Sequence, residues 1–336
     1  MSELKEPVDL AALAELSARI GSNPDIIQAA GGNTSIKENG VMWIKASGTL
    51  LAEAQQKDIF VPVDATAMCM ALADPDQDAD QPINFALGQS GLRPSIETSL
   101  HAVFDQRVVV HVHCVNTLSW AIQQGSDELL ATKLLNFKWA SVGYCKPGAM
   151  LASAVSHVID TGAEIVILKN HGLIVAAETV HAAETLLFDV IASLEAPMHP
   201  FCTIDVEALG KGLPKGWEAL DKDHPLHQVA LSPARITHAT TGSLYPDHVI
   251  FCGIGAQILT DDDPAATQEA PPFYIVPDRG AIIQCDASQG AKALVRCLGD
   301  VLMRLDEDAV LEYLSDEQNY QLLDWDAEKY RQKLNA

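Results

Sequence analysis

Apolar residues recur along the chain in two spacings, and each spacing predicts a different kind of element. Between Asp9 and Gly21 the apolar residues lie on one helical stripe, so a helix is predicted there (Leu10, Leu13, Leu16 and Ile20). Helices are also predicted at residues 66–73, 94–104 and 181–195, and from about residue 117. Short apolar runs predict strands at residues 41–44, 59–63, 108–113, 164–168 and 173–176.

The stretches between these elements are rich in small or acidic residues. We interpret residues 29–37 as a turn of small residues, 45–49 as the loop after a strand, and 74–84 as an acidic loop. Strands and helices do not alternate in regular β-α-β units. The sequence therefore favours an α+β fold over a doubly wound sheet.

The final third of the chain predicts a second, smaller unit. Residues 196–217 hold six prolines and glycines and are interpreted as a linker. Beyond them, a small α/β unit is predicted from strands and one helix, at residues 248–252, 273–276, 281–285 and 290–305. A polar helical tail follows. The predicted domains are residues 1–200 and 201–336.

The composition is that of an ordinary globular protein. Hydrophobic residues make up 48% of the 336 residues and charged residues 20%, and no apolar run reaches the roughly 18 residues of a membrane span. The first residues lack the pattern of a signal peptide. Seven cysteines are scattered without a Cys-x-x-Cys pair, which indicates reduced thiols. We therefore expect a cytoplasmic protein that does not act at a membrane.

The chain is strongly acidic. Its formal net charge is −23, with 45 acidic and 22 basic residues. Non-specific nucleic-acid binding depends on basic surface, so a nucleic-acid partner is not expected. An anionic small molecule would have to be held by a local pocket of amides and a few lysines.

Three histidines follow two of the predicted strands. His111 and His113 end one apolar run, and because side chains two residues apart in a strand point the same way, the two rings are expected side by side. His171 follows the run 165–168. Three imidazoles of this kind make a zinc site with an open coordination position, although histidines in apolar strands are also common as hydrogen-bonded core residues.

Glu97 lies in what is predicted to be the first turn of a helix with Ser95 as its N-cap. One interpretation is that the carboxylate only stabilises the helix dipole. Beside a metal and shielded from water, it could instead shuttle a proton. His101, four residues later on the same helix face, either orients Glu97 or packs in the core.

Two loops of small residues could bind an anion. Residues 31–35 and 47–49 are rich in backbone amides and hydroxyls that no large side chain covers, and Ser95 could supply a third edge. Taken singly, each loop is also explained as simple turn chemistry. Lys37 and Lys45 are either counter-charges for the anion or surface residues.

In order along the chain, these segments resemble the class II aldolase/adducin family. The segments are Gly31 to Ser35, Lys45 to Gly48, Arg93 to His101, His111 to His113 and Asn170 to Leu173. The phrase Arg-Pro-Ser-Ile-Glu-Thr-x-Leu-His is most similar to the aldolase part of bifunctional rhamnulose-1-phosphate aldolase/alcohol dehydrogenases. The resemblance covers residues 10–195. The dehydrogenase half of those enzymes has no counterpart here, so no nicotinamide activity is implied.

The resemblance implies a role for each matching residue. It makes His111, His113 and His171 the zinc ligands, and Glu97 the catalytic acid/base. The positions that hold the substrate phosphate are Asn33, Ser47, Gly48 and Ser95. Tyr144 is similar to a family tyrosine contributed across a subunit boundary. Ile96 departs from the pattern, because fuculose-phosphate aldolase has a second serine there, which implies a weaker phosphate grip or an unphosphorylated substrate.

The resemblance also implies an architecture and an activity. We expect a three-layer core with a mainly antiparallel sheet between helices, a homotetramer, and one Zn²⁺ per chain. The expected activity is cleavage of a ketose, foremost a ketose 1-phosphate, by retro-aldol chemistry through a zinc-bound enediolate. Decarboxylation or epimerisation of a sugar-derived substrate on the same scaffold is the alternative enzyme. A non-catalytic scaffold like adducin is the third hypothesis.

Overall fold

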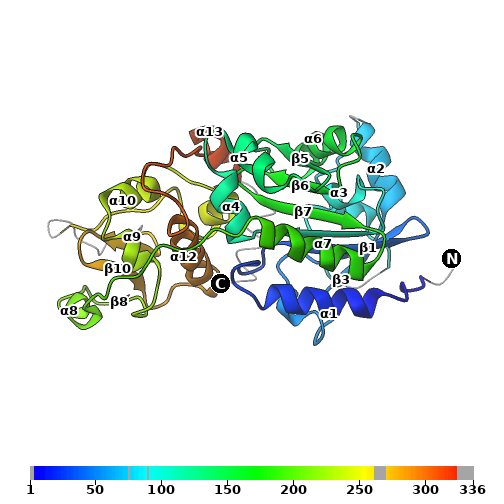
Figure 1. Cartoon of the computed structure of the whole chain (residues 1–336). Helices are drawn as coiled ribbons and strands as arrows, with labels where there is room; N and C mark the ends of the chain where they lie inside the picture. The colour runs from blue at the N-terminus through cyan, green and yellow to red at the C-terminus, as the bar shows by residue number, and fades with distance from the viewer. Residues whose placement is uncertain (1–3, 75, 89–90, 261–269, 324–336) are drawn as a thin grey trace.

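The computed structural model describes residues 4–74, 76–88, 91–260 and 270–323 of the chain. Figure 1 shows two parts side by side, the larger one built around a long sheet and the smaller one around a short sheet. None of the helices in the described ranges combines the length and the apolar character needed to cross a bilayer.

The larger sheet has seven strands in the order β3-β2-β1-β4-β7-β6-β5. The strands are β1 (Asn33–Glu38), β2 (Val41–Lys45), β3 (Phe60–Asp64), β4 (Val108–Val112), β5 (Trp139–Val142), β6 (Ile165–Leu168) and β7 (Gly172–Ala177). Of these neighbours, β5 and β6 pair in parallel and the others antiparallel. The expected mainly antiparallel sheet is confirmed.

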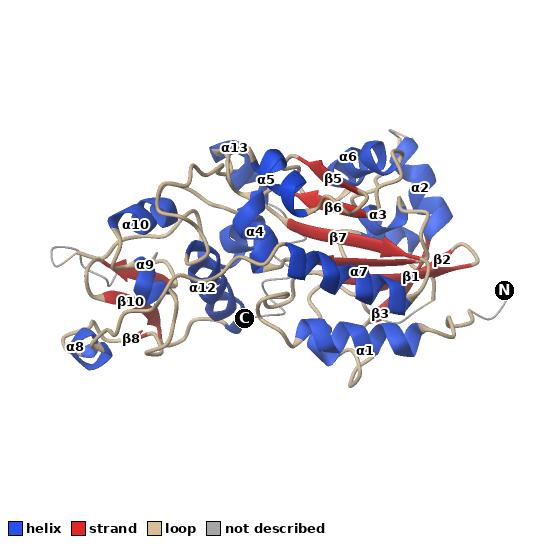
Figure 2. Ribbon diagram, viewed as in Figure 1, coloured by secondary structure: helices blue, strands red, loops and turns tan. Residues whose placement is uncertain are grey.

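Alternating strand residues face two helical layers. Val108 and Val110 of β4 join one apolar cluster with α1 (Leu10–Gly21) and α7 (Val180–Ser193). Val109 joins another, with residues of α3 (Thr98–Ala102) and α6 (Ala149–Ile159). Because each face of the sheet buries its own set of side chains, a three-layer core results, as Figure 2 shows. The α+β fold predicted from the sequence is therefore confirmed.

Further helices connect the strands of this part. They are α2 (Ala65–Ala73), α4 (Val115–Ala121) and α5 (Ser126–Lys133), with the short 3₁₀ turns η1 (Leu51–Glu53) and η2 (Pro82–Phe85). The helix predicted at 66–73 and the helix predicted from about 117 are both present. No element was predicted for α5, β5 or α6.

The smaller part contains a three-stranded antiparallel sheet in the order β8-β10-β9. Its strands are β8 (Trp217–Ala219), β9 (Phe273–Val276) and β10 (Gly280–Gln284). Its helices are α8 (Val206–Gly210), α9 (Leu226–Val229), α10 (Pro233–Thr240), α11 (Pro246–Cys252), α12 (Gln289–Leu302) and α13 (Asp316–Leu323). The two strands and the long helix predicted beyond residue 270 are confirmed, whereas the end of the predicted tail lies outside the described residues.

The strand predicted at 248–252 is wrong, because this segment is helix α11. Pro246 occupies the first turn, where its fixed φ suits a helix, and Asp247 lies in the same turn, where a carboxylate favours the helix dipole. Almost the whole helix is buried. A short apolar run that is buried all round cannot be assigned to helix or strand by periodicity, which explains the error.

Two further predictions need correction near the site. Residues 33–38 form strand β1 and not a turn, because Asn33 to Ile36 pair with β4 along their whole length. The helix predicted from residue 94 begins only at Thr98, and Glu97, not Ser95, occupies its N-cap position. Ser95 instead belongs to the extended stretch before the helix, where its N–H donates to the Lys45 carbonyl.

The two parts share a hydrophobic cluster. Val115, Leu118 and Ile122 of the larger part pack with residues of the smaller one, among them Leu294 and Leu298 of α12. Leu118 is fully buried. The domain boundary near residue 200 stays a prediction, but this shared core makes separate unfolding of the two parts unfavourable.

We predict that Leu118→Ala lowers the free energy of unfolding by about 2–5 kcal/mol, the usual cost of a cavity at a buried leucine. Denaturant unfolding followed by circular dichroism measures the change. Leu135→Ala is the matched control, since Leu135 is 78% exposed, and it should cost less than about 0.5 kcal/mol. Unfolding in two separate transitions, with neither midpoint shifted by Leu118→Ala, would contradict this prediction.

Two histidines of the smaller part are buried in neutral form. Burial lowers the pKa of His248 to about 4, partly offset by its contact with the Gly255 carbonyl. Burial, assisted by the charge of Arg296, lowers the pKa of His224 to about 3. Because the folded-state pKa lies below the ordinary 6.5, the unfolded chain takes up protons first as the pH falls. Their stabilising contribution is complete above about pH 6.5 and is lost as the pH falls, down to about 4 for His248 and about 3 for His224.

We therefore predict that the metal-free protein is less stable at pH 5 than at pH 7. At pH 5 each of these two histidines lowers the free energy of unfolding by about 2 kcal/mol relative to pH 7. His248→Gln should reduce the loss, whereas the exposed His157→Gln should leave it unchanged. Urea unfolding at the two pH values measures this. An equal loss in His248→Gln and wild-type protein would show that His248 does not contribute.

Candidate active site

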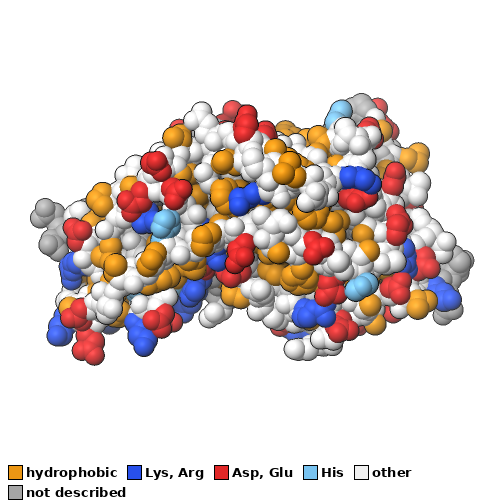
Figure 3. Space-filling view, in the orientation of Figure 1, with side chains coloured by type: hydrophobic (Ala, Val, Ile, Leu, Met, Phe, Trp, Pro, Cys, Tyr) orange, Lys and Arg blue, Asp and Glu red, His pale blue; other side chains and the backbone are white. Residues whose placement is uncertain are grey.

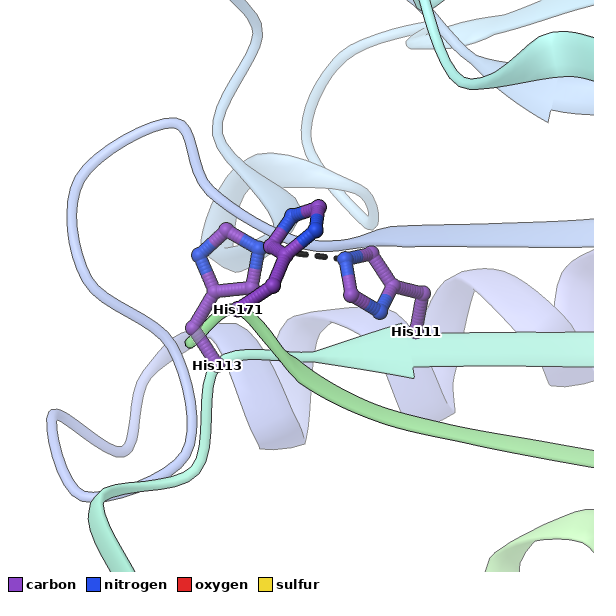
Figure 4. Close-up of side chains that lie close together, drawn as sticks. All are labelled: His111, His113 and His171. Atoms are coloured by element: carbon purple, nitrogen blue, oxygen red, sulfur yellow. Dashed lines mark hydrogen bonds between the residues drawn. The ribbon is translucent and has the colours of Figure 1, made fainter. Parts of the chain in front are cut away.

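His111, His113 and His171 meet at one end of the large sheet. His111 belongs to β4, where it pairs with Asn33 of β1 and Ile174 of β7. His113 follows two residues later, and His171 lies in the turn between β6 and β7. Their ring centroids are 4.9, 4.9 and 5.1 Å apart, and one nitrogen from each ring lies within 4.8 Å of the other two. Figure 4 shows the three rings turned toward one another.

Hydrogen bonds to the outer ring nitrogens fix which nitrogens face inward. The Nδ1 of His111 donates to the Leu173 carbonyl at 3.1 Å, and the Nδ1 of His113 to Asp247 Oδ2 at 3.0 Å. In neutral rings this leaves a lone pair on each Nε2, and the two Nε2 atoms lie 3.1 Å apart (Figure 4). A tetrahedral ion with bonds of about 2.05 Å needs about 3.3 Å between two ligand nitrogens, so the pair fits a shared cation.

The surroundings keep His111 in the form that binds metals. Burial lowers its pKa from 6.5 to about 4, and the negative charge of Glu97 offsets only part of this effect. His111 is therefore neutral at neutral pH, as a ligand imidazole must be. The donor set fits a divalent metal.

The carboxylate of Glu97 points into the histidine cluster. Its Oε1 lies 3.6 Å from His111 Nε2 and 3.4 Å from His171 Nε2, and its Oε2 accepts a 2.6 Å hydrogen bond from Asn33 Nδ2. Only 6% of Glu97 is exposed. Among the described residues its side chain makes no capping hydrogen bond to the helix it precedes. The carboxylate therefore lies where it could act on a substrate bound to a metal at the histidines, and it does not cap the helix.

His101 does not orient Glu97. Its Nδ1 lies 2.8 Å from Ser35 Oγ, and burial, together with the nearby His111, lowers its pKa well below the ordinary value. His101 is therefore a neutral core residue, which was one of the two interpretations of it. The residue that holds Glu97 is Asn33, through its amide.

A pocket beside the histidine cluster brings the predicted anion-binding residues together. It is lined by Asn33, Ser47, Gly48 and Ser95, as well as Glu97, His113 and His171. The loops are joined by backbone bonds, because the Ser47 N–H donates to the Arg93 carbonyl and the Ser95 N–H to that of Lys45. Of the site residues implied by the resemblance, only His111 and Tyr144 are missing from the described lining of this cavity. His111 lies directly behind it, against His113 and His171.

Lys45 supplies a positive charge to this pocket. It is only 2% exposed, and its Nζ donates to the Ala30 carbonyl at 3.0 Å. Lys37, the other candidate counter-charge, turns its Nζ to the carbonyls of Phe104 and Gln106. It is missing from the described lining of the pocket. Of the two lysines, Lys45 is the one that an anionic substrate group would meet.

Tyr144 occupies a different place. Its side chain packs against Val249, Leu314 and Leu322 of the smaller part, and it is missing from the described lining of the pocket. A catalytic role for Tyr144 therefore stays a prediction.

The sequence analysis missed Asp247 and the wall of the pocket that surrounds it. Pro246, Asp247 and Ile250 of α11 line the pocket opposite the family motifs. Asp247 is 4% exposed. No spacing links it to the histidines, since it lies 134 residues beyond His113. The one local signal was the Pro-Asp pair at the start of a helix, which the predicted strand concealed.

Two glycines allow the backbone to approach the cluster. A Cβ at Gly172 would lie 2.4 Å from the Val112 carbonyl oxygen and 3.2 Å from atoms of both His111 and His113. A Cβ at Gly31 would lie 2.9 Å from both Asp247 Oδ2 and His113 Nδ1. Neither position can accept a side chain without movement of the ligands.

Among known protein families, one family model matches the segment of the chain that contains most of this site. Residues 11–196 match the Class II Aldolase and Adducin N-terminal domain. The L-fuculose phosphate aldolase of Methanococcus maripaludis is 26% identical over 183 residues, which are 52% of this chain and 88% of that protein. The uncharacterized oxidoreductase YuxG of Bacillus subtilis is 27% identical over 203 residues, 56% of this chain but 29% of that protein.

Among solved structures, the N-terminal class II aldolase domain of a conserved protein from Thermoplasma acidophilum matches with a TM-score of 0.48. It is 26% identical, and the match covers 58% of this chain and 95% of that one. Asp247 and the rest of α11 lie beyond the segment that the family model matches.

We predict that Gly172→Ala weakens metal binding and lowers the free energy of unfolding by about 1–3 kcal/mol, because the added methyl group forces β7 away from β4. Calorimetric titration with Zn²⁺ and urea unfolding measure the two effects. Gly143→Ala is the control, since no described atom lies within 4 Å of a Cβ there. Wild-type metal affinity in Gly172→Ala would show that the close approach of the strands is not needed.

Proposed function

Since the chain belongs to the class II aldolase and adducin family, we propose that it is a zinc-dependent aldolase that cleaves a ketose by retro-aldol chemistry. The observation that carries the proposal is the arrangement of Glu97 beside three buried imidazoles, two of which line one cavity with the loops that would bind an anion. A ketose 1-phosphate is the foremost substrate class.

His111, His113 and His171 would hold the metal. Three imidazole nitrogens that converge on one point favour Zn²⁺ over the hard cations, which prefer oxygen ligands. When bound, the ion supplies Lewis-acid chemistry, which polarises the carbonyl group of the substrate. The low exposure of the histidines excludes water from this end of the pocket.

Glu97 would carry the proton. In the cleavage direction the bond between C3 and C4 breaks, the electron pair stays with C3, and the C4 hydroxyl loses its proton as the aldehyde forms. The Glu97 carboxylate takes up that proton, directly or through a second base or water, and delivers it to C3. Asn33 holds Oε2 and leaves Oε1 turned toward the histidines, which orients the carboxyl for this transfer.

The other end of the pocket would hold the substrate's anionic group. Lys45 would give the charge, and the hydroxyls of Ser47 and Ser95 and the backbone of Gly48 line the pocket where a phosphate would bind. Ile96 lines the same pocket with an apolar side chain. The grip on the anion therefore has fewer donors than a second serine would provide, and free ketoses belong in the test.

Three details complete the proposal. Tyr144 is proposed to act at the aldehyde oxygen, the chain is proposed to assemble as a homotetramer in the cytoplasm, and residues 1–200 are proposed to be the catalytic domain. Light scattering of the purified protein measures the assembly. A tetramer would place further residues near the site only if its interface adjoins the pocket.

The direct test is a screen of zinc-loaded protein against phosphorylated and free ketoses. Aldehyde release with a three-carbon product supports the aldolase. Release of carbon dioxide, or an isomer of unchanged mass, would instead identify a decarboxylase or an epimerase on the same scaffold. Elemental analysis should find about one zinc per chain. A protein that carries no metal after zinc-replete expression would overturn the proposal and leave the non-catalytic scaffold.

We predict that Glu97→Gln keeps the zinc but lowers kcat about 10²- to 10⁴-fold, the usual contribution of a general acid or base. The amide keeps the size of the side chain and loses the proton. Glu164→Gln is the control, because Glu164 is an exposed partner of Lys138 at the surface. Steady-state kinetics and elemental analysis of both variants check this. Wild-type turnover in Glu97→Gln would remove Glu97 from the chemistry.

A further inference from the structure

Residues outside the family-matching segment hold two of the three histidines in place. The first is Asp247, whose Oδ2 accepts the Nδ1 proton of His113 at 3.0 Å. Asp247 is 4% exposed and belongs to α11, a helix of which six of seven residues are buried. A buried carboxylate on a buried helix has little freedom to move, so it fixes the ring of His113.

The second contact acts on His171 through its neighbour. Asn170 has a φ of 55°, and its Nδ2 donates to the carbonyls of Leu244 and Glu312 at 3.0 and 2.8 Å. Both carbonyls belong to the smaller part. The turn that carries His171 is therefore held by the smaller part, which also contacts His113 through Asp247.

The packing around these contacts is close. Gly31 lies against the pair formed by Asp247 and His113, where even a methyl group would intrude. On the other side, Val249 of α11 packs with Leu314 and Leu322. The position of Asp247 is thus set by the packed interior of the smaller part, and not by an exposed loop.

We propose that the smaller part is a structural half of the metal site, with Asp247 as the positioning residue for His113. The inference rests on the proposed function in that it requires a metal at the three histidines. A carboxylate on Nδ1 keeps the imidazole in the tautomer whose Nε2 faces the metal and makes that nitrogen a better donor. Metal binding and the packing of α11 are consequently linked.

The test compares the metal affinity of the full-length wild type, Asp247→Asn and Asp300→Asn. Loss of a partner of this kind usually weakens metal affinity 10- to 100-fold, and we expect that loss in Asp247→Asn by competition with a chromophoric chelator. Asp300→Asn is the matched control: its carboxylate is also buried in the smaller part, but it pairs with Arg296.

A spectroscopic readout separates positioning from general destabilisation. With Co²⁺ in place of zinc, the visible absorption bands report the ligand field, and they should change in Asp247→Asn but not in Asp300→Asn. Hydrogen exchange of the wild type gives a measurement without mutation. Metal binding should slow exchange of the α11 amides, residues 247–252, and leave those of β8 unchanged.

Each outcome has one meaning. If the wild type binds no metal, the proposed function fails first. If the wild type binds metal and Asp247→Asn binds it equally well, or Asp300→Asn weakens it as much, the positioning role is overturned and the proposed function survives. If Asp247→Asn does not fold, the exchange experiment decides: no metal-dependent protection of α11 contradicts the inference.

Discussion

The convergence of three imidazole nitrogens is the constraint on which this site depends. Each ring must be turned so that a lone pair faces the centre. Antiparallel pairing of β4 with β7 places His111 beside the strand that follows His171, and Gly172 lets the two backbones come close enough. The outer contacts with the Leu173 carbonyl and Asp247 then set the orientation of two rings.

The smaller part changes how the pocket is understood. In the segment that matches the family, the sheet supplies the three histidines and the loops supply the residues proposed to bind an anion. Helix α11 adds Pro246 and Ile250 to the lining of the cavity and contacts His113 through Asp247. The apolar cluster shared by α4 and α12 packs the smaller part, and with it this wall of the pocket, against the larger part. On the face of the molecule seen in Figure 3, acidic, basic and apolar side chains are intermixed.

The parts of the site that sequence could predict are those encoded by short patterns. Alternation along a strand correctly put His111 and His113 on one side, and the turn after an apolar run correctly put His171 near a strand end. The role of Asn33 as the partner of Glu97 could not be predicted, because it depends on β1 pairing with β4. Asp247 was hidden for a similar reason, since contacts between distant segments leave no local spacing. The error over α11 arose where an apolar run is buried on every side.

The measurement that tests the central claim most directly is a crystal structure of the zinc-loaded protein with anomalous scattering recorded at the zinc edge. The account predicts one anomalous peak per chain, about 2.0–2.1 Å from Nε2 of each of His111, His113 and His171. A peak bound elsewhere, or a structure in which His171 has turned away from the other two rings while zinc is present in excess, would contradict it.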